Sequence, residues 1–131
     1  MPMQFRDDPA GDQFFALTTY RKDGSGVSGP IWLAPDNGHW YGYTPGHSWK
    51  VRRLRRDPRV EIAASDFHGE PREPARAGRA RILTGRDRRL AMRALTAKYG
   101  MQFRIFRLVT LLGRPRRRGG PPVGLEIALD A

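Results

Sequence analysis

The chain has 131 residues, 39% of them hydrophobic and 10% aromatic, which is enough for one domain with a core and too few for two. It contains no cysteine, which excludes disulfides, thiol catalysis and thiolate metal sites. Its net charge of +11, from 21 arginines and three lysines against 13 acidic residues, favours an anionic partner. The first residues lack the charged and apolar regions of a signal peptide, so a cytoplasmic protein is expected.

The first half of the chain predicts three strands joined by short turns. Residues 1–13 are polar and are expected to form an N-terminal arm. Residues 14–20 are rich in β-forming side chains, and residues 27–34 are predicted to pair with them as a hairpin. An Asn-Gly turn at residues 37–38 supplies the positive φ angles that a tight hairpin needs, and a third strand is predicted at 39–44. Three consecutive strands of this kind predict a meander.

The second half predicts three more strands and one or two helices. Strands are expected at 59–65, at 75–83 and at 123–129, where apolar and polar or small residues alternate. Residues 86–99 have apolar side chains at helical spacing. Residues 101–112 are apolar but too short and too interrupted by arginine to span a bilayer. They are expected to pack in the core or on a dimer partner, with a membrane-surface helix as the alternative.

Six strands with short turns fit a small antiparallel barrel rather than a parallel β-α-β sheet. No internal repeat or linker divides the chain, so a single domain is predicted over residues 14–131. The fold class is therefore mainly β (α+β).

Residues 43–58 contain the strongest candidate for an anion-binding site. They predict a strand end, a turn and a short basic helix that a proline terminates. The first turn of a helix has unpaired N–H groups and a partial positive charge. Thr44, Ser48 and Lys50 add donors there, and Arg53 follows three residues later on the same helix face. The alternative is an ordinary N-cap followed by a solvated basic face.

Signals for other chemistries are weak. Residues 24–29 spell G-x-G-x-x-G, but a predicted strand follows them where a dinucleotide site needs a helix, so they are expected to be a hairpin turn. The histidines have no metal-ligand spacing, and the glutamates show no acid/base pairing. We expect no catalytic side chain and no metal site, so an enzyme would depend on a cofactor. The aromatic residues fall at core-like strand positions, so no nucleic-acid partner is expected.

Several short segments occur in an order typical of one protein family. They are residues 15–20, 22–24, 28–32, 43–44, 48–51, 53–55, 57–60 and 78–80. This series resembles the flavin/deazaflavin oxidoreductase superfamily, whose best-known relative is pyridoxamine 5′-phosphate oxidase. It is most similar to the small PPOX-class enzymes that depend on coenzyme F420. The resemblance covers about residues 14–130.

The resemblance implies a six-stranded antiparallel split β-barrel of the FMN-binding type with short helices. It implies a homodimer with two cofactor sites at the subunit interface. The strand Ser28, Gly29, Pro30, Ile31 and Trp32 would run along the cofactor ring. The phosphate would be held by the segments that contain Tyr43, Thr44, Ser48, Trp49 and Lys50, with Arg53 in the same site.

The resemblance also implies the chemistry. Trp49 stands where the pyridoxamine oxidase branch often has a basic residue, which favours coenzyme F420 over FMN. F420 carries a phosphate and a chain of glutamates, and this polyanionic tail suits Lys50, Arg52, Arg53, Arg55 and Arg56. The implied activity is hydride transfer between reduced F420 and a small electron-poor organic substrate. The alternatives are an FMN-dependent reductase or oxidase of the same fold and a non-catalytic flavin- or haem-binding barrel.

Overall fold

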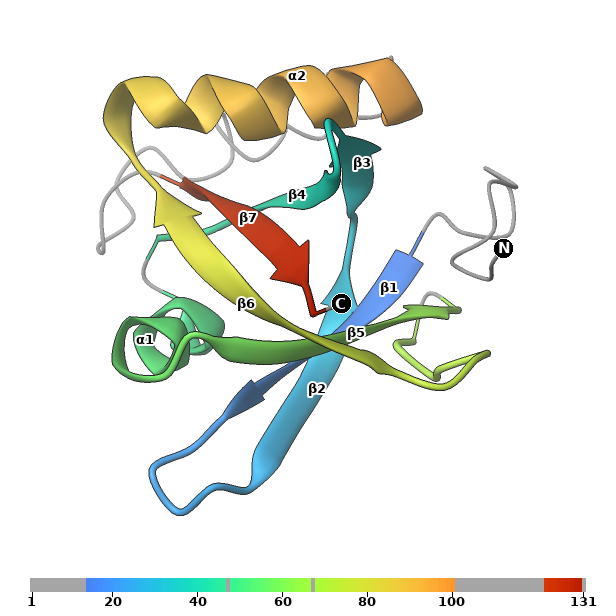
Figure 1. Ribbon diagram of the computed structural model, residues 1–131, viewed down its shortest axis with the longest axis vertical. Helices are drawn as coiled ribbons and strands as arrows, with labels where there is room; N and C mark the ends of the chain where they lie inside the picture. Colours follow the sequence, from blue (N-terminus) through green and yellow to red (C-terminus); the bar gives the residue numbers. More distant parts are fainter. Residues whose placement is uncertain (1–13, 47, 67, 101–121, 131) are drawn as a thin grey trace.

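The computed structural model describes residues 14–46, 48–66, 68–100 and 122–130, which form one antiparallel sheet and two α-helices (Figure 1). The strands are β1 (Phe14–Tyr20), β2 (Gly26–Ile31), β3 (Ala34–Asp36), β4 (His39–Thr44), β5 (Arg59–Ser65), β6 (Arg76–Leu83) and β7 (Val123–Leu129). The helices are α1 (Trp49–Arg56) and α2 (Arg88–Tyr99), and a 3₁₀ turn, η1 (Gly85–Asp87), precedes α2.

The sheet has the hydrogen-bonded strand order β2-β1-β5-β6-β7-β4-β3. All neighbouring strands in this order are antiparallel. β2 and β3 follow each other in the chain but lie at opposite edges of the sheet. The sheet is strongly curled (Figure 1), and β2 contacts β4 without a strand ladder between them. The result is a barrel that is open along one seam, which confirms the predicted α+β split barrel.

The predicted hairpin between 14–20 and the strand that follows it is confirmed, because β2 pairs with β1. The predicted end of that strand at residue 34 and the predicted meander are wrong. The structure divides that segment into β2 and β3, with Trp32 and Leu33 between them. Leu33 packs in the cluster inside the barrel, whereas the next residue, Ala34, packs in a second cluster beneath α2. The pairing partner changes over these residues, because Ile31 lies opposite Phe15 of β1, whereas Ala34 lies opposite Tyr41 of β4. The chain therefore crosses from one sheet edge to the other, and β4 pairs with β7 instead of β2.

Most other predicted elements are confirmed. The strands at 14–20, 39–44, 59–65 and 123–129 have the predicted bounds, and Asn37 and Gly38 both have positive φ angles in the turn between β3 and β4. The helix predicted at 86–99 is shorter, because its first residues form η1. The predicted arm at 1–13 and the apolar segment at 101–112 lie outside the described residues. Within the described ranges, no helix is long and apolar enough to cross a membrane.

Two hydrophobic clusters fix the elements around the open seam. The cluster inside the barrel is formed by residues of β1, β2, β5, β6 and β7, together with Leu33 and with Leu54 of α1. Trp40 of β4 packs against it. In the second cluster, α2 packs on β3, β4 and β7 through Ala91, Ala94, Leu95 and Tyr99. The N-cap of α1 fixes where the helix begins, and its buried residues, Val51 and Leu54, fix which face packs on the barrel. Both helices are thereby held beside the seam between β2 and β4.

A polar row crosses three strands on the outside of the barrel. Tyr41 of β4 and Arg81 of β6 both lie opposite Glu126 of β7. The Tyr41 hydroxyl donates to Glu126 Oε2 at 2.8 Å, and Arg81 Nε donates to Oε1 at 2.9 Å. Burial and the bond to Glu126 raise the pKa of Tyr41 to about 12. Burial would raise the pKa of Glu126, but the hydrogen bonds from Arg81 and Tyr41 lower it overall.

Glu126→Gln is expected to reduce the free energy of unfolding by about 1 kcal/mol near pH 7, because Arg81 loses a charged acceptor but remains largely in solvent. A carboxylate whose folded pKa is lowered stabilises the fold above its unfolded pKa and stops doing so as pH falls through the folded value. The difference between the wild type and the variant should therefore shrink below about pH 4.5. Urea unfolding between pH 3.5 and 7 measures this, and a difference independent of pH would contradict it.

Candidate functional site

A cavity of about 250 Å³ opens at the seam of the barrel, where β2 and β4 separate. Its wall is formed by residues of β1, β2, β4, α1 and α2 and by the residues that directly follow β2 and β4. The lining residues are Phe14, Pro30, Ile31, Trp32, Tyr43, Thr44, Pro45, Lys50 and Leu95. Most are aromatic or aliphatic, and Tyr43, Thr44 and Lys50 add polar groups. A hydrophobic cavity with a few polar groups is the usual form of a cofactor or substrate site.

One wall of the cavity is a rigid aromatic surface. The Trp32 ring stacks on Tyr99 with a centroid distance of 4.7 Å and an interplanar angle of 17°. The edge of Phe14 meets Trp32 at 6.2 Å and 66°. The Tyr99 hydroxyl donates to the Leu33 carbonyl at 3.0 Å, which ties the stack to the crossing between β2 and β3. These contacts hold Trp32 in one orientation, so a planar ligand would meet a preformed surface.

Thr44 gives the cavity a buried polar group. Its side chain is only 4% exposed, and it lies at the end of β4 where the strand reaches the cavity. Within the part of the chain that the structure describes, the Thr44 hydroxyl makes no hydrogen bond. Buried hydroxyls almost always have a partner, because an unpaired one costs about 1–3 kcal/mol. The hydroxyl is therefore available to a ligand in the cavity.

Lys50 adds a cation to the wall of the same cavity. It lies in the first turn of α1, where the helix N–H groups add positive potential and where no acidic residue is present. Burial lowers the pKa of Lys50, and the nearby charge of Arg53 lowers it further. Among the described residues, no carboxylate forms an ion pair with Lys50. A half-buried ammonium without a counterion attracts an anionic group.

The structure brings six of the predicted site residues together around the cavity. They are Pro30, Ile31, Trp32, Tyr43, Thr44 and Lys50. Three further lining residues were not predicted. Phe14 and Pro45 adjoin predicted segments, so a broader reading of those segments could have included them. Leu95 comes from α2, and its helical spacing indicated only an apolar face.

The other five predicted site residues do not line the cavity. Ser28 and Gly29 lie earlier on β2, where Gly29 has open space on its Cβ side. Ser48 is the N-cap of α1, and its hydroxyl accepts from the Val51 N–H at 3.3 Å. Trp49 is 69% exposed, and Arg52 lies 4.8 Å from its ring centroid.

Arg53 also lies away from the cavity. Its Nε donates to the Thr19 hydroxyl of β1 at 2.6 Å. The side chain therefore lies against the hairpin of β1 and β2. The ammonium of Lys50 is close enough to feel its charge.

Comparison with known protein families shows to which family the chain belongs. The sequence profile of the pyridoxamine 5′-phosphate oxidase family matches residues 1–127, almost the whole chain. The chain belongs to the pyridoxamine 5′-phosphate oxidase family. No curated protein sequence matches this family member.

Solved structures share the fold of this pyridoxamine 5′-phosphate oxidase family member at low sequence identity. An F420 reductase has a TM-score of 0.61 and 17% identity, with 100% of this chain and 97% of that chain covered. The heme storage protein HutZ from Vibrio cholerae has a TM-score of 0.63 and 13% identity, with coverages of 94% and 85%. A FAD-binding protein from Mesorhizobium loti has a TM-score of 0.55 and 20% identity, with coverages of 91% and 80%.

Proposed function

We propose that this protein is an oxidoreductase that transfers hydride between reduced coenzyme F420 and a small electron-poor organic substrate. The observation that carries the proposal is the cavity at the seam, which is lined by the buried Thr44, by Lys50 and by an aromatic wall. The family and the F420 reductase with the same fold support the proposal.

Each part of the cavity has a role in this proposal. Thr44 and Lys50 bind the phosphate of the cofactor, with the first N–H groups of α1 nearby. Pro30, Ile31 and Trp32 flank its ring, and the stack of Trp32 on Tyr99 fixes the orientation of that wall. The apolar lining excludes water from the ring. The cofactor supplies the hydride chemistry, and no side chain is assigned as a nucleophile or base.

Charge is the reason to prefer F420 over FMN. FMN ends in one phosphate, whereas F420 continues into a chain of carboxylates. The exposed side of α1 beyond Lys50 carries Arg52 and Arg55 and has no acidic residue in its first turn. Trp49 is apolar and exposed, so it adds no phosphate ligand. A long anionic tail is attracted by this surface more strongly than a single phosphate.

We also propose that the protein acts as a homodimer in which a second copy completes the cofactor site. β2 is an edge strand beside the cavity, and the exposed Trp49 lies next to Lys50. A second copy that covered these features would close the cavity and bury an exposed indole. Light scattering should give twice the monomer mass at micromolar concentration, and a strict monomer would contradict this part of the proposal.

Fluorescence titration with coenzyme F420 and with FMN, at low and at high salt, tests the proposed cofactor. We expect F420 to bind more tightly and to lose more affinity in high salt, because several charged contacts are screened. FMN is expected to bind the same cavity with a smaller salt effect. If FMN binds more tightly than F420, or if the protein is purified with bound FMN, the cofactor is FMN and not F420. Absence of binding by both would remove the cofactor proposal.

A further inference from the structure

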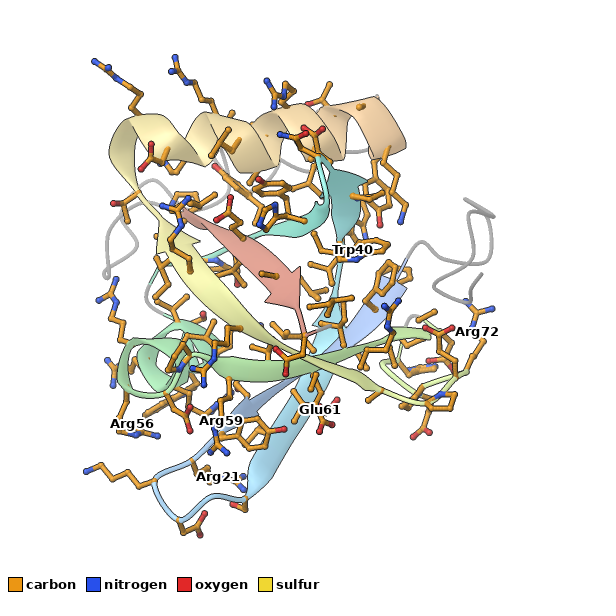
Figure 2. The ribbon with its side chains drawn as sticks, viewed as in Figure 1. Arg21, Trp40, Arg56, Arg59, Glu61 and Arg72 are labelled. Atoms are coloured by element: carbon orange, nitrogen blue, oxygen red, sulfur yellow. The ribbon has the colours of Figure 1, made fainter. Side chains whose placement is uncertain are left out.

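Three arginines meet where α1 lies against the hairpin of β1 and β2. We call Arg21, Arg53 and Arg56 the arginine triad, and Figure 2 shows Arg21 and Arg56 on this side of the molecule. All three donate to neutral oxygens: Arg53 Nε to Thr19 Oγ1 at 2.6 Å, Arg56 Nη2 to the Tyr20 carbonyl at 3.2 Å, and Arg21 Nη1 to Ser25 Oγ at 3.1 Å. The neutral acceptors hold the guanidinium groups in place without neutralising them.

The charge of the arginine triad is not compensated by the surrounding protein. Residues 19–26 and 48–61 contain eight cationic and three acidic side chains. Asp23 accepts from Ser25 and Asp57 pairs with Arg59 at 2.8 Å, each with a residue two positions away, and Glu61 lies near the Tyr20 hydroxyl. Asp23 feels the charge of Arg21 and Asp57 that of Arg56, but neither forms an ion pair with the triad in the described part of the chain.

Arg53 also lies close enough to Arg21 and to Arg56 to feel the charge of each. Burial lowers the pKa of Arg53, and the charges of Arg21 and Arg56 lower it further. Arg53 is half-buried and is anchored on Thr19, which is 1% exposed, so it cannot swing away without breaking that bond. A cluster of like charges that is fixed in this way becomes more stable when it binds an anion.

The arginine triad is distinct from the cavity. Phe14 lines the cavity at one end of β1, whereas Thr19 and Tyr20 lie at its other end, roughly 16 Å further along the strand. On α1, Lys50 lines the cavity, and Arg53 and Arg56 follow on the same face, about 4.5 Å and 9 Å further along the helix axis. α1 therefore carries one cation at the cavity and two at the hairpin.

We propose that the arginine triad is a second anion site, separate from the cofactor cavity, that binds the phosphate group of a small molecule. Guanidinium groups present planar pairs of N–H donors that match the oxygens of a phosphate. Each triad arginine uses one nitrogen for its anchor and keeps others free for a ligand. Asp23 and Asp57 flank the triad, and their charge disfavours an extended polyanion such as a nucleic acid.

Calorimetric titration with sodium pyrophosphate at constant ionic strength tests the site. Arg21→Gln and Arg56→Gln are each expected to weaken binding about fivefold, and the double variant by more than tenfold. Arg55→Gln is the matched control, because Arg55 is an exposed arginine of α1 without a hydrogen bond or ion pair in the described residues. It should change the affinity less than twofold. Arg53→Gln is avoided, because loss of the Thr19 bond could disturb the fold.

Three results would overturn the proposal. If Arg55→Gln weakens pyrophosphate binding as much as Arg21→Gln, the attraction is diffuse and no site exists. If Thr44→Val, which alters only the cavity, abolishes binding, or if F420 displaces pyrophosphate, the anion belongs to the cofactor site. If a single-stranded oligonucleotide binds more tightly than pyrophosphate and depends on Arg21 and Arg56, the ligand is a nucleic acid. Retention of binding in Thr44→Val supports the separate site, whatever cofactor the cavity holds.

Discussion

Lys50→Met is expected to weaken coenzyme F420 binding by at least tenfold. The substitution keeps the apolar stem of the side chain and removes the ammonium at the end of the cavity. A hydrogen bond to a charged group contributes about 1.5–3 kcal/mol, which corresponds to a factor of ten or more in affinity. Fluorescence titration of the wild type and the variant with F420 measures the change. Unchanged affinity would remove Lys50 from the proposed site.

The lowered pKa of Lys50 gives this prediction a pH signature. The ammonium binds an anion only when it is protonated, so affinity should fall as pH rises through the lowered pKa. A bound phosphate raises that pKa again, so binding should take up protons in the alkaline range. Lys50→Arg should keep most of the affinity and lose the alkaline decline, because a guanidinium stays charged. Arg55→Met on the same helix should weaken F420 binding less than Lys50→Met does and should keep the alkaline decline, because Lys50 is unchanged.

Gly78→Ala is expected to lower the free energy of unfolding by about 1–3 kcal/mol or more. Gly78 lies on β6 between β5 and β7, and a Cβ there would stand 2.5 Å from the Ala128 carbonyl oxygen and 3.0 Å from Leu129 Cα. Both atoms belong to the backbone of β7, so neither can rotate away as a side chain could. The variant can be accommodated only if β6 and β7 move apart. Urea unfolding at neutral pH measures the loss.

Gly29→Ala is the matched control for Gly78→Ala. Gly29 also lies within a strand, but no atom is within 4 Å of the position that its Cβ would occupy. Its substitution should change the free energy of unfolding by no more than about 0.5 kcal/mol. If both variants unfold at the same urea concentration, close packing of β6 on β7 is not what requires glycine at position 78.

Local sequence signals were sufficient for most elements of the fold. The run of β-forming residues at 14–20 and the alternating run at 123–129 are both strands in the structure. Asn37 and Gly38 adopt the positive φ angles that their residue types favour. Ser48 caps α1, and Val51 and Leu54 form its buried side. Each of these features depends on interactions within a few residues.

The order of the strands required the tertiary structure. β4 pairs with β7, which lies about 80 residues further along the chain, and no local pattern encodes that partner. The second predicted strand is divided because its first part pairs with β1 and its last part pairs with β4, two strands on different sides of the seam. Periodicity shows that a residue is apolar and which neighbours share its face. It does not show against which distant element that face will pack.

The candidate site divides in the same way. The residue types by themselves placed Thr44 and Lys50 at a candidate anion site, and the family resemblance implied that Pro30 and Trp32 lie beside a cofactor ring. Only the tertiary structure showed that these residues meet at the seam of the barrel, with Leu95 of α2 closing the wall. It also showed that Trp49 is exposed and that Arg53 lies against the hairpin. The direction of a long side chain depends on the partners that folding brings near it, and for Arg53 that partner is a threonine 34 residues earlier in the chain.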